Sequence, residues 1–121
     1  MAIVLVVEDD TLICEVAIMM IEDLGHTTLS ASDVDEAMDI LRSDKPIDAL
    51  FTDVYLKSVV LGGCDVAQFA VRVRPFLRVL YTTGNKVSEK MKSLLIAGTH
   101  VLPKPYTEFE LHTSIKRLLA S

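Results

Sequence analysis

The stretch IVLVVEDD, residues 3–10, joins five consecutive aliphatic residues directly to three consecutive carboxylates. A continuous run of valine, isoleucine and leucine is typical of a strand that is buried on both faces of a parallel sheet. The acids after this run would then lie at the carboxyl end of the strand, which is the edge where open α/β sheets bind ligands. The stretch therefore predicts both the class of fold and the position of its site.

A second strand repeats this arrangement. Residues 47–52, IDALFT, lead directly into Asp53. If the two strands lie side by side, the carboxylates of Glu8, Asp9 and Asp53 converge. Mutual repulsion makes such a cluster costly unless a cation or a proton lies among the carboxylates. The two strands together therefore predict a cation site.

The rest of the chain alternates short apolar runs with segments of helical periodicity. This alternation predicts one α/β domain, residues 1–121, with a parallel five-stranded sheet and helices on both of its faces. The expected strands cover residues 2–7, 26–31, 47–52, 77–82 and 100–102. The expected helices cover about 11–24, a segment that follows Ser32, 64 or 65 to 74, 87–97 and 107–120.

Local signals mark several ends of these elements. We expect Asp10 and Ser32 to cap the first two helices, and Thr107 with Glu110 to form a capping box at the last one. The pair Gly62-Gly63 predicts a tight turn before the third helix. Helical spacing places six apolar residues on the buried side of the first helix: Ile13, Val16, Ala17, Met20, Ile21 and Leu24.

Composition excludes several classes of function. The 17 acidic residues outnumber the 12 lysines and arginines, for a net charge of -5, which argues against direct binding to nucleic acid or to an anionic membrane. No apolar run is long enough to span a bilayer, and the N-terminus lacks the features of a signal peptide. Cys14 and Cys64 are far apart and form no CxxC motif, so we expect reduced thiols in a cytoplasmic protein.

Other strand ends on the same edge add a hydroxyl and an amine. Thr83 follows the fourth strand, and Lys104 follows the fifth. Carboxylates and a backbone carbonyl suit a hard cation such as Mg2+, which favours phosphate oxygens. Such a cation would let an anionic phosphate donor approach the carboxylate of Asp53, and an aspartate can accept a phosphoryl group as an acyl phosphate. The predicted chemistry is Mg2+-dependent phosphoryl transfer to Asp53.

These residues resemble the response-regulator receiver domain, a signalling family, over the whole chain. The resemblance rests on four motifs at successive strand ends: Val7-Glu8-Asp9-Asp10, Thr52-Asp53, Thr83-Gly84 and Lys104-Pro105. It is closest to a subgroup of stand-alone receivers with Thr-Gly and Lys-Pro-Tyr motifs. It implies a flavodoxin-like (βα)5 fold, which is a doubly wound parallel sheet with strand order 2-1-3-4-5, and a cis Lys104-Pro105 bond.

The resemblance also implies roles. Asp53 would be the phosphoacceptor, and Thr83 and Lys104 would contact the phosphoryl group. Asp9 would ligate Mg2+ directly with help from Glu8, and Asp53 and the carbonyl of Tyr55 would complete the ligands. The donor would be a sensor histidine kinase or a phosphotransfer protein. Output would pass through protein contacts of the fourth helix, fifth strand and fifth helix, or the chain would act as a phosphate sink, as a monomer or weak homodimer.

The sequence departs from the family pattern in three places. Val101 stands where the family usually has an aromatic residue that moves on phosphorylation, and Tyr106 instead follows Lys-Pro. The loop after Asp53 lacks the common Met-Pro and carries apolar residues 59–61, so it is either mobile or covered by a partner. Tyr55 and Asn85 occupy positions that tune dephosphorylation in the family.

Two other functions are compatible with parts of the sequence. The turn at residues 82–85 has weak similarity to the phosphate-binding turn of a flavodoxin-like cofactor module, although it follows the wrong strand. A metal-dependent phosphatase would use an aspartate nucleophile but needs a second acid where Tyr55 stands. The remaining polar or sulfur-bearing candidates are expected to be structural: Thr82, His26, His100, His112, Met19, Met20, Met38 and Met91.

Overall fold

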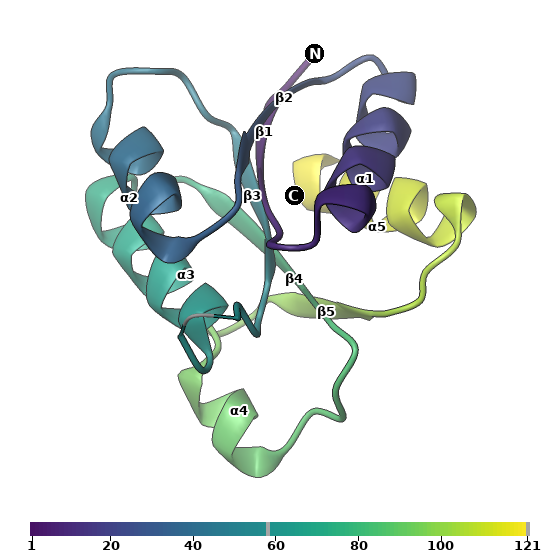
Figure 1. Cartoon of the computed structure of the whole chain (residues 1–121). Coiled ribbons are helices and arrows are strands. Elements are labelled where there is room, and N and C mark those ends of the chain that lie inside the picture. Colours follow the sequence, from purple (N-terminus) through teal and green to yellow (C-terminus); the bar gives the residue numbers. More distant parts are fainter. Residues whose placement is uncertain (58, 121) are drawn as a thin grey trace.

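The computed structural model describes residues 1–57 and 59–120. Five strands and five helices alternate along this part of the chain, as the sequence predicts (Figure 1). The strands are β1 Ile3–Val7, β2 Thr27–Ala31, β3 Ala49–Asp53, β4 Arg78–Thr83 and β5 His100–Pro103. The helices are α1 Thr11–Asp23, α2 Val34–Arg42, α3 Gly62–Val73, α4 Glu89–Leu94 and α5 Glu108–Ala120.

The strands form one parallel sheet in the order β2-β1-β3-β4-β5, which confirms the predicted topology. Val7 at the end of β1 is in register with Thr52 of β3, and Asp53 is in register with Thr82 of β4. The register brings the carboxyl ends of the three central strands to one edge of the sheet. Residues that follow these strands therefore meet there.

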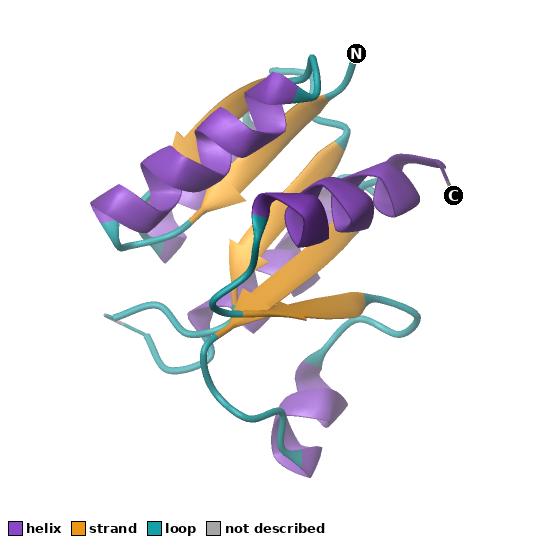
Figure 2. Cartoon of the chain, turned by 90° about the vertical axis from the view of Figure 1, so that its right-hand side faces the viewer, coloured by secondary structure: helices purple, strands orange, loops and turns teal. Residues whose placement is uncertain are grey.

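Alternate side chains of β1 pack into two separate hydrophobic cores. Leu5 and Val7 face the core that α2 and α3 cover, whereas Val4 and Val6 face the core beneath α1 and α5. In Figure 1 these helix pairs lie on opposite sides of the sheet, and in Figure 2 α1 and α5 lie in front of the strands. Because both faces of β1 are covered, all of its positions from Val4 to Val7 are apolar and buried.

Side-chain caps fix the starts of α1, α2, α4 and α5. Asp10 accepts a hydrogen bond from the amide of Ile13, and Thr107 and Glu110 form the predicted capping box. The predicted cap of α2 is wrong by one residue, because Asp33 accepts the hydrogen bond from the amide of Glu36. The amide of Ser32 instead donates to the carboxylate of Glu36, which satisfies the neighbouring end of the helix.

Two further predicted boundaries are wrong. Gly62 and Gly63 form the first turn of α3 and not a separate tight turn, so this helix starts earlier than predicted and ends at Val73. The fourth helix is also shorter than the predicted 87–97, because Ser88 caps it and the backbone becomes extended at Leu95.

The outer side of α1 is more apolar than the core requires. Ala17 and Ile21 are buried as predicted, but Ile13 and Val16 are 36% and 39% exposed. Met19 is 64% exposed, so the expectation that it fills a core gap is wrong, whereas Met91 of α4 is buried. The helix therefore presents an unpaired apolar surface beside the loop that precedes α5.

Both cysteines are free thiols, Cys64 buried and Cys14 half-buried. Burial raises the pKa of each thiol. Among the described residues, we find no helix with the length and apolar character needed to cross a membrane.

Candidate functional site

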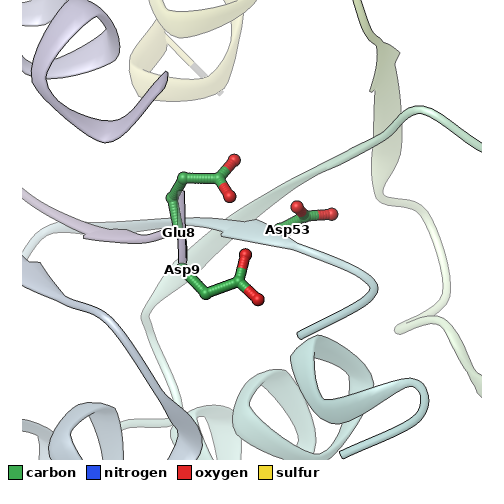
Figure 3. A group of neighbouring side chains, drawn as sticks. All are labelled: Glu8, Asp9 and Asp53. Carbon is green, nitrogen blue, oxygen red and sulfur yellow. The ribbon is translucent and has the colours of Figure 1, made fainter. Parts of the chain in front are cut away.

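Three carboxylates meet at the carboxyl edge of the sheet. Glu8 and Asp9 directly follow β1, and Asp53 is the last residue of β3. One carboxylate oxygen from each residue lies within 4.8 Å of the other two, and Figure 3 shows the three carboxylates gathered in one region. Glu8 and Asp53 are only 5% and 6% exposed. The cluster predicted from the two strand ends is therefore present and largely screened from water.

Lys104 supplies the positive charge of this cluster. Its ammonium group donates hydrogen bonds to Oε1 of Glu8 at 2.6 Å and to Oδ2 of Asp53 at 2.7 Å. The backbone amide of Lys104 donates to the carbonyl oxygen of Thr83, which ties the segment after β5 to the end of β4. The peptide bond between Lys104 and Pro105 is cis, as the resemblance implied.

The pKa values of the paired groups reflect their burial and their contacts. Burial raises the pKa of Glu8, and this outweighs the opposite effect of the hydrogen bonds from Lys104 and from the amide of Asp10. Burial alone would lower the pKa of Lys104, but its hydrogen bonds to Asp53 and Glu8 outweigh burial and raise it. Lys104 is therefore a cation at neutral pH and remains one until well into the alkaline range.

Backbone amides from the loop after β3 hold two of the carboxylates. The amide of Lys57 donates to Oδ2 of Asp9 at 2.6 Å, and the amide of Tyr55 donates to Oδ1 of Asp53 at 3.3 Å. These bonds place the loop across the site. They also bring the main chain of Tyr55 against the carboxylate of Asp53, although the role of its carbonyl as a metal ligand stays a prediction.

The two threonines at the end of β4 have different partners. The hydroxyl of Thr82 donates to the carbonyl of Leu102, which supports its expected structural role. The hydroxyl of Thr83 accepts a hydrogen bond from the amide of Asn85. Thr83 is buried on the rim of the site, but we find no hydrogen bond between its side chain and Asp53 within residues 1–57 and 59–120.

Tyr106 packs beside the site and not within it. Its ring meets that of Phe51 edge-on, with centroids 6.0 Å apart, and burial raises the pKa of Tyr106 to about 12. Val101 lies half-buried against the core on the side of α3. The large aromatic side chain near Lys104 is thus on the α1 and α5 side of the sheet.

The donor set fits a hard divalent cation. Three carboxylates and a single ammonium meet here, and all the ligand atoms that the acids offer are oxygen. Hard oxygen donors in this number suit Mg2+, which is usually held by one or two carboxylates and retains several waters. Glu8, Asp9 and Asp53 are therefore able to hold such an ion.

Sequence reasoning missed two parts of the site, the amide of Lys57 and the close approach of Gly63 to the main chain of Asp53. A backbone amide leaves no signature in the sequence, so Lys57 could not have been found. The Gly62-Gly63 pair was a signal. Glycine lowers the stability of a helix, so two adjacent glycines at its start indicate a close contact that leaves no room for a side chain.

Comparison with protein families gives one consistent answer. Residues 4–116 match the model of the response regulator receiver domain. The response regulator MprA of Mycobacterium avium is 32% identical over 117 residues, and so is MprA of Mycobacterium tuberculosis. Each match covers 96% of this chain but 50% of the relative, so the chain spans about half the length of these curated relatives.

Solved structures show the same fold. A response regulator receiver protein from Sinorhizobium medicae superimposes with a TM-score of 0.90 at 23% identity, over 99% of this chain and 95% of that one. The receiver domain of the hybrid histidine kinase CckA gives a TM-score of 0.80 at 25% identity, over 97% of this chain and 98% of that one. Both are similar in the arrangement of the whole sheet and its helices.

Proposed function

Because the chain belongs to the family of response regulator receiver domains, which act in two-component signalling, we propose that the carboxylate of Asp53 is its phosphoacceptor. The observation that carries this assignment is the contact between Asp53 and Lys104 in a pocket that also holds Glu8 and Asp9. The donor is a phosphohistidine on a sensor histidine kinase or on a phosphotransfer protein.

The transfer is a substitution at phosphorus. An oxygen of Asp53 attacks, a P–O bond forms, the P–N bond of the phosphohistidine breaks, and the imidazole nitrogen keeps the electron pair and takes up a proton. Lys104 already contacts Oδ2 of Asp53, so its ammonium is placed to neutralise charge on the incoming phosphoryl oxygens. The amide of Tyr55 holds the other oxygen and so orients the carboxylate.

The residues of this site also fit a catalytic Mg2+. Glu8, Asp9, Asp53 and the carbonyl of Tyr55 would hold the ion. When bound, Mg2+ supplies charge neutralisation between the anionic phosphoryl group and the acidic pocket. The hydrogen bond that Asp9 accepts from the amide of Lys57 fixes its side chain. We expect the same site to support slow hydrolysis of the acyl phosphate by water.

The phosphoryl group would act on the rest of the domain through residues at the ends of β4 and β5. The amide of Lys104 donates a hydrogen bond to the carbonyl of Thr83. A movement of either residue toward a phosphoryl group on Asp53 would therefore shift the ends of both β4 and β5. β5 is one of the two edge strands, and α4 beside it has only six residues. We assign the switching surface to α4, β5 and α5.

This chain has an apolar surface next to the acids that suits a protein donor. A cavity of about 540 Å³ is lined by apolar side chains of α1, including Leu12 and Val16, and by Lys104 and Tyr106 after β5. Leu12 is 69% exposed, although the site itself is polar. An apolar surface adjoining a reactive carboxylate suits a protein donor better than a small phosphate ester. We expect the domain to act in the cytoplasm, as a monomer or weak homodimer.

The mass of the intact protein after incubation with acetyl phosphate and Mg2+ tests the assignment of Asp53. We expect one phosphate adduct on the wild type, loss of the adduct with EDTA, and no adduct on Asp53→Asn. Asp65→Asn, at an exposed aspartate in the first turn of α3, is the control and should be modified normally. An undiminished adduct on Asp53→Asn would exclude Asp53 as the acceptor.

The donor surface has a separate test. Leu12→Asp should slow phosphoryl transfer from a histidine kinase while leaving the reaction with acetyl phosphate unchanged, because only the protein donor needs the apolar surface. Phe76→Asp is the matched control, since Phe76 is 95% exposed but follows α3 at the opposite edge of the sheet. Equal slowing by both variants would argue against a donor surface on α1.

A further inference from the structure

We propose that Gly63 is a positioning residue for phosphoryl transfer, because the absence of its side chain sets the position of the main chain that carries Asp53 and Tyr55. This inference rests on the proposed role of Asp53. Gly63 lies in α3, outside the acidic cluster, and would directly affect the geometry of that cluster.

The first turn of α3 lies directly against the end of β3. A Cβ atom built at Gly63 would lie 2.7 Å from the carbonyl carbon of Asp53 and 2.9 Å from Cα of Val54, and it would overlap the carbonyl oxygen of Asp53. All three neighbours are backbone atoms, which cannot rotate away as a flexible side chain can. Any side chain at position 63 therefore requires a shift of the helix or of the strand end.

Hydrogen bonds hold this segment of main chain from two sides. The amide of Gly63 donates to the carbonyl of Val54 at 3.0 Å, and the amide of Val54 donates to the carbonyl of Thr82 at 2.9 Å. Val54 is thus held between α3 and β4, through its carbonyl on one side and its amide on the other. A helix displaced by a methyl group at position 63 would pull or push Val54, and with it the main chain of Asp53 and Tyr55.

Space explains the glycine better than backbone conformation does. The glycines with positive φ are Gly25 and Gly98, whereas Gly63 has the ordinary backbone of a helix. Glycine in a helix costs about 1 kcal/mol relative to alanine, so helix propensity would favour replacing it. The close approach of Asp53 is the feature of this position that an alanine cannot accommodate.

A displacement at this point would affect two functional groups together. The overlap must be relieved by movement on the order of 1 Å, and a misplacement of that size in an active site can lower the rate by about 100-fold. Asp53 would move relative to Lys104, and the carbonyl of Tyr55 would move relative to Asp9. We therefore expect weaker Mg2+ binding as well as slower phosphoryl transfer.

Gly62 provides a matched control. A Cβ atom at Gly62 would meet side-chain atoms, Val34 Cγ2 at 2.9 Å and Val59 Cβ at 3.2 Å, so Gly62→Ala disturbs the same helical turn without reaching the main chain of Asp53.

The experiment compares Gly63→Ala and Gly62→Ala with the wild type. Initial rates with acetyl phosphate give the maximal rate and KM, calorimetry gives the Kd for Mg2+, and urea unfolding gives the folded fraction under the assay conditions. For Gly63→Ala we expect a maximal rate lower by about 100-fold per folded molecule, and a higher Kd for Mg2+. The control Gly62→Ala should keep both values within about threefold of the wild type, since it leaves the main chain of Asp53 in place.

Stability and positioning are separated by design. If Gly63→Ala is not folded at 25 °C, all three proteins are assayed at 10 °C in trimethylamine N-oxide, which favours the folded state. A wild-type maximal rate and Mg2+ affinity in folded Gly63→Ala would overturn the proposal, even if that variant unfolds more easily. Failure of the proposed function looks different, because the adduct would then persist on Asp53→Asn whatever residue stands at position 63.

Discussion

Lys104 donates a 2.7 Å hydrogen bond to Asp53, although 51 residues separate them in the sequence. The same ammonium reaches Glu8, so one cation from the loop after β5 connects the ends of β1 and β3. Lys104 therefore has two functions in the structure. It neutralises charge among buried acids, and it is placed to bind the phosphoryl oxygens that we propose Asp53 receives.

Replacing Lys104 by methionine should make the stability of the protein depend on Mg2+. The change leaves Glu8 and Asp53 buried without their cation, and breaking a buried ion pair in this way typically costs about 3–5 kcal/mol. Because the lysine side chain is 18% exposed, we expect a loss near the lower end, about 3 kcal/mol. Mg2+ bound only by the folded state should restore part of it.

Urea unfolding with Mg2+ and with EDTA measures this dependence. Lys92→Met is the control, because Lys92 forms an exposed pair with Glu89 and should change stability by less than about 0.5 kcal/mol. A Lys104→Met protein as stable as the wild type in EDTA would contradict the role of this lysine as the cation of the cluster.

Asp9→Asn should weaken the binding of Mg2+ by at least about tenfold, since even partners in the outer shell of a metal site are worth about 10–100-fold in affinity. Asp10→Asn is a closely matched control. It removes the same charge one residue away, but Asp10 caps α1 through the amide of Ile13, and asparagine caps a helix equally well. Calorimetric titration with MgCl2 distinguishes the two variants, and an equal effect of both would mean that general charge, and not ligation, decides the affinity.

Thr82 and Thr83 provide a test in which a hydroxyl is replaced by a methyl group of similar size. Thr82→Val and Thr83→Val each remove one buried hydroxyl, and each should cost about 1 kcal/mol of stability. Only Thr83→Val should slow phosphorylation by acetyl phosphate or change the lifetime of the adduct, because the hydroxyl of Thr82 is bonded to the carbonyl of Leu102. Phosphorylation kinetics that change equally in both variants would remove Thr83 from the site.

Tyr106 should make the protein less stable in alkali. Burial raises its pKa to about 12, so the folded protein keeps the phenolic proton at a pH where the unfolded chain has begun to lose it. Its contribution is complete below about pH 10 and is lost as the pH rises toward 12, because the unfolded state then binds fewer protons than the native state. Urea unfolding between pH 8 and pH 11 should show a smaller decline for Tyr106→Phe.

Parallel β-structure explains why most of the site could be predicted. Once IVLVV at residues 3–7 indicates a strand buried on both faces, the acids after it and Asp53 after β3 must share one edge. The place of Lys104 follows from the same topology. These predictions depend on strand direction and order, which apolar patterns and chain alternation reveal.

Features that depend on tertiary contacts could not be predicted in this way. The helical spacing of Ile13 and Val16 correctly predicted α1. The prediction that both side chains are buried was wrong, because α5 covers only part of α1. Ser32 and Asp33 are both good caps, and sequence alone does not distinguish them. The Gly62-Gly63 pair suggested a turn, whereas Gly63 is constrained by the backbone of residues 53 and 54 and Gly62 by neighbouring side chains. These contacts arise only in the folded structure.

The acidic cluster and its lysine come from the ends of three strands that span most of the chain. No short fragment contains all of these groups, and local opening of β5 withdraws the amine while the acids remain. If Asp53 is the phosphoacceptor, we expect a molecule whose β5 has opened not to accept the phosphoryl group, because it lacks the lysine of the site. Phosphorylation would then depend on the formation of the complete sheet.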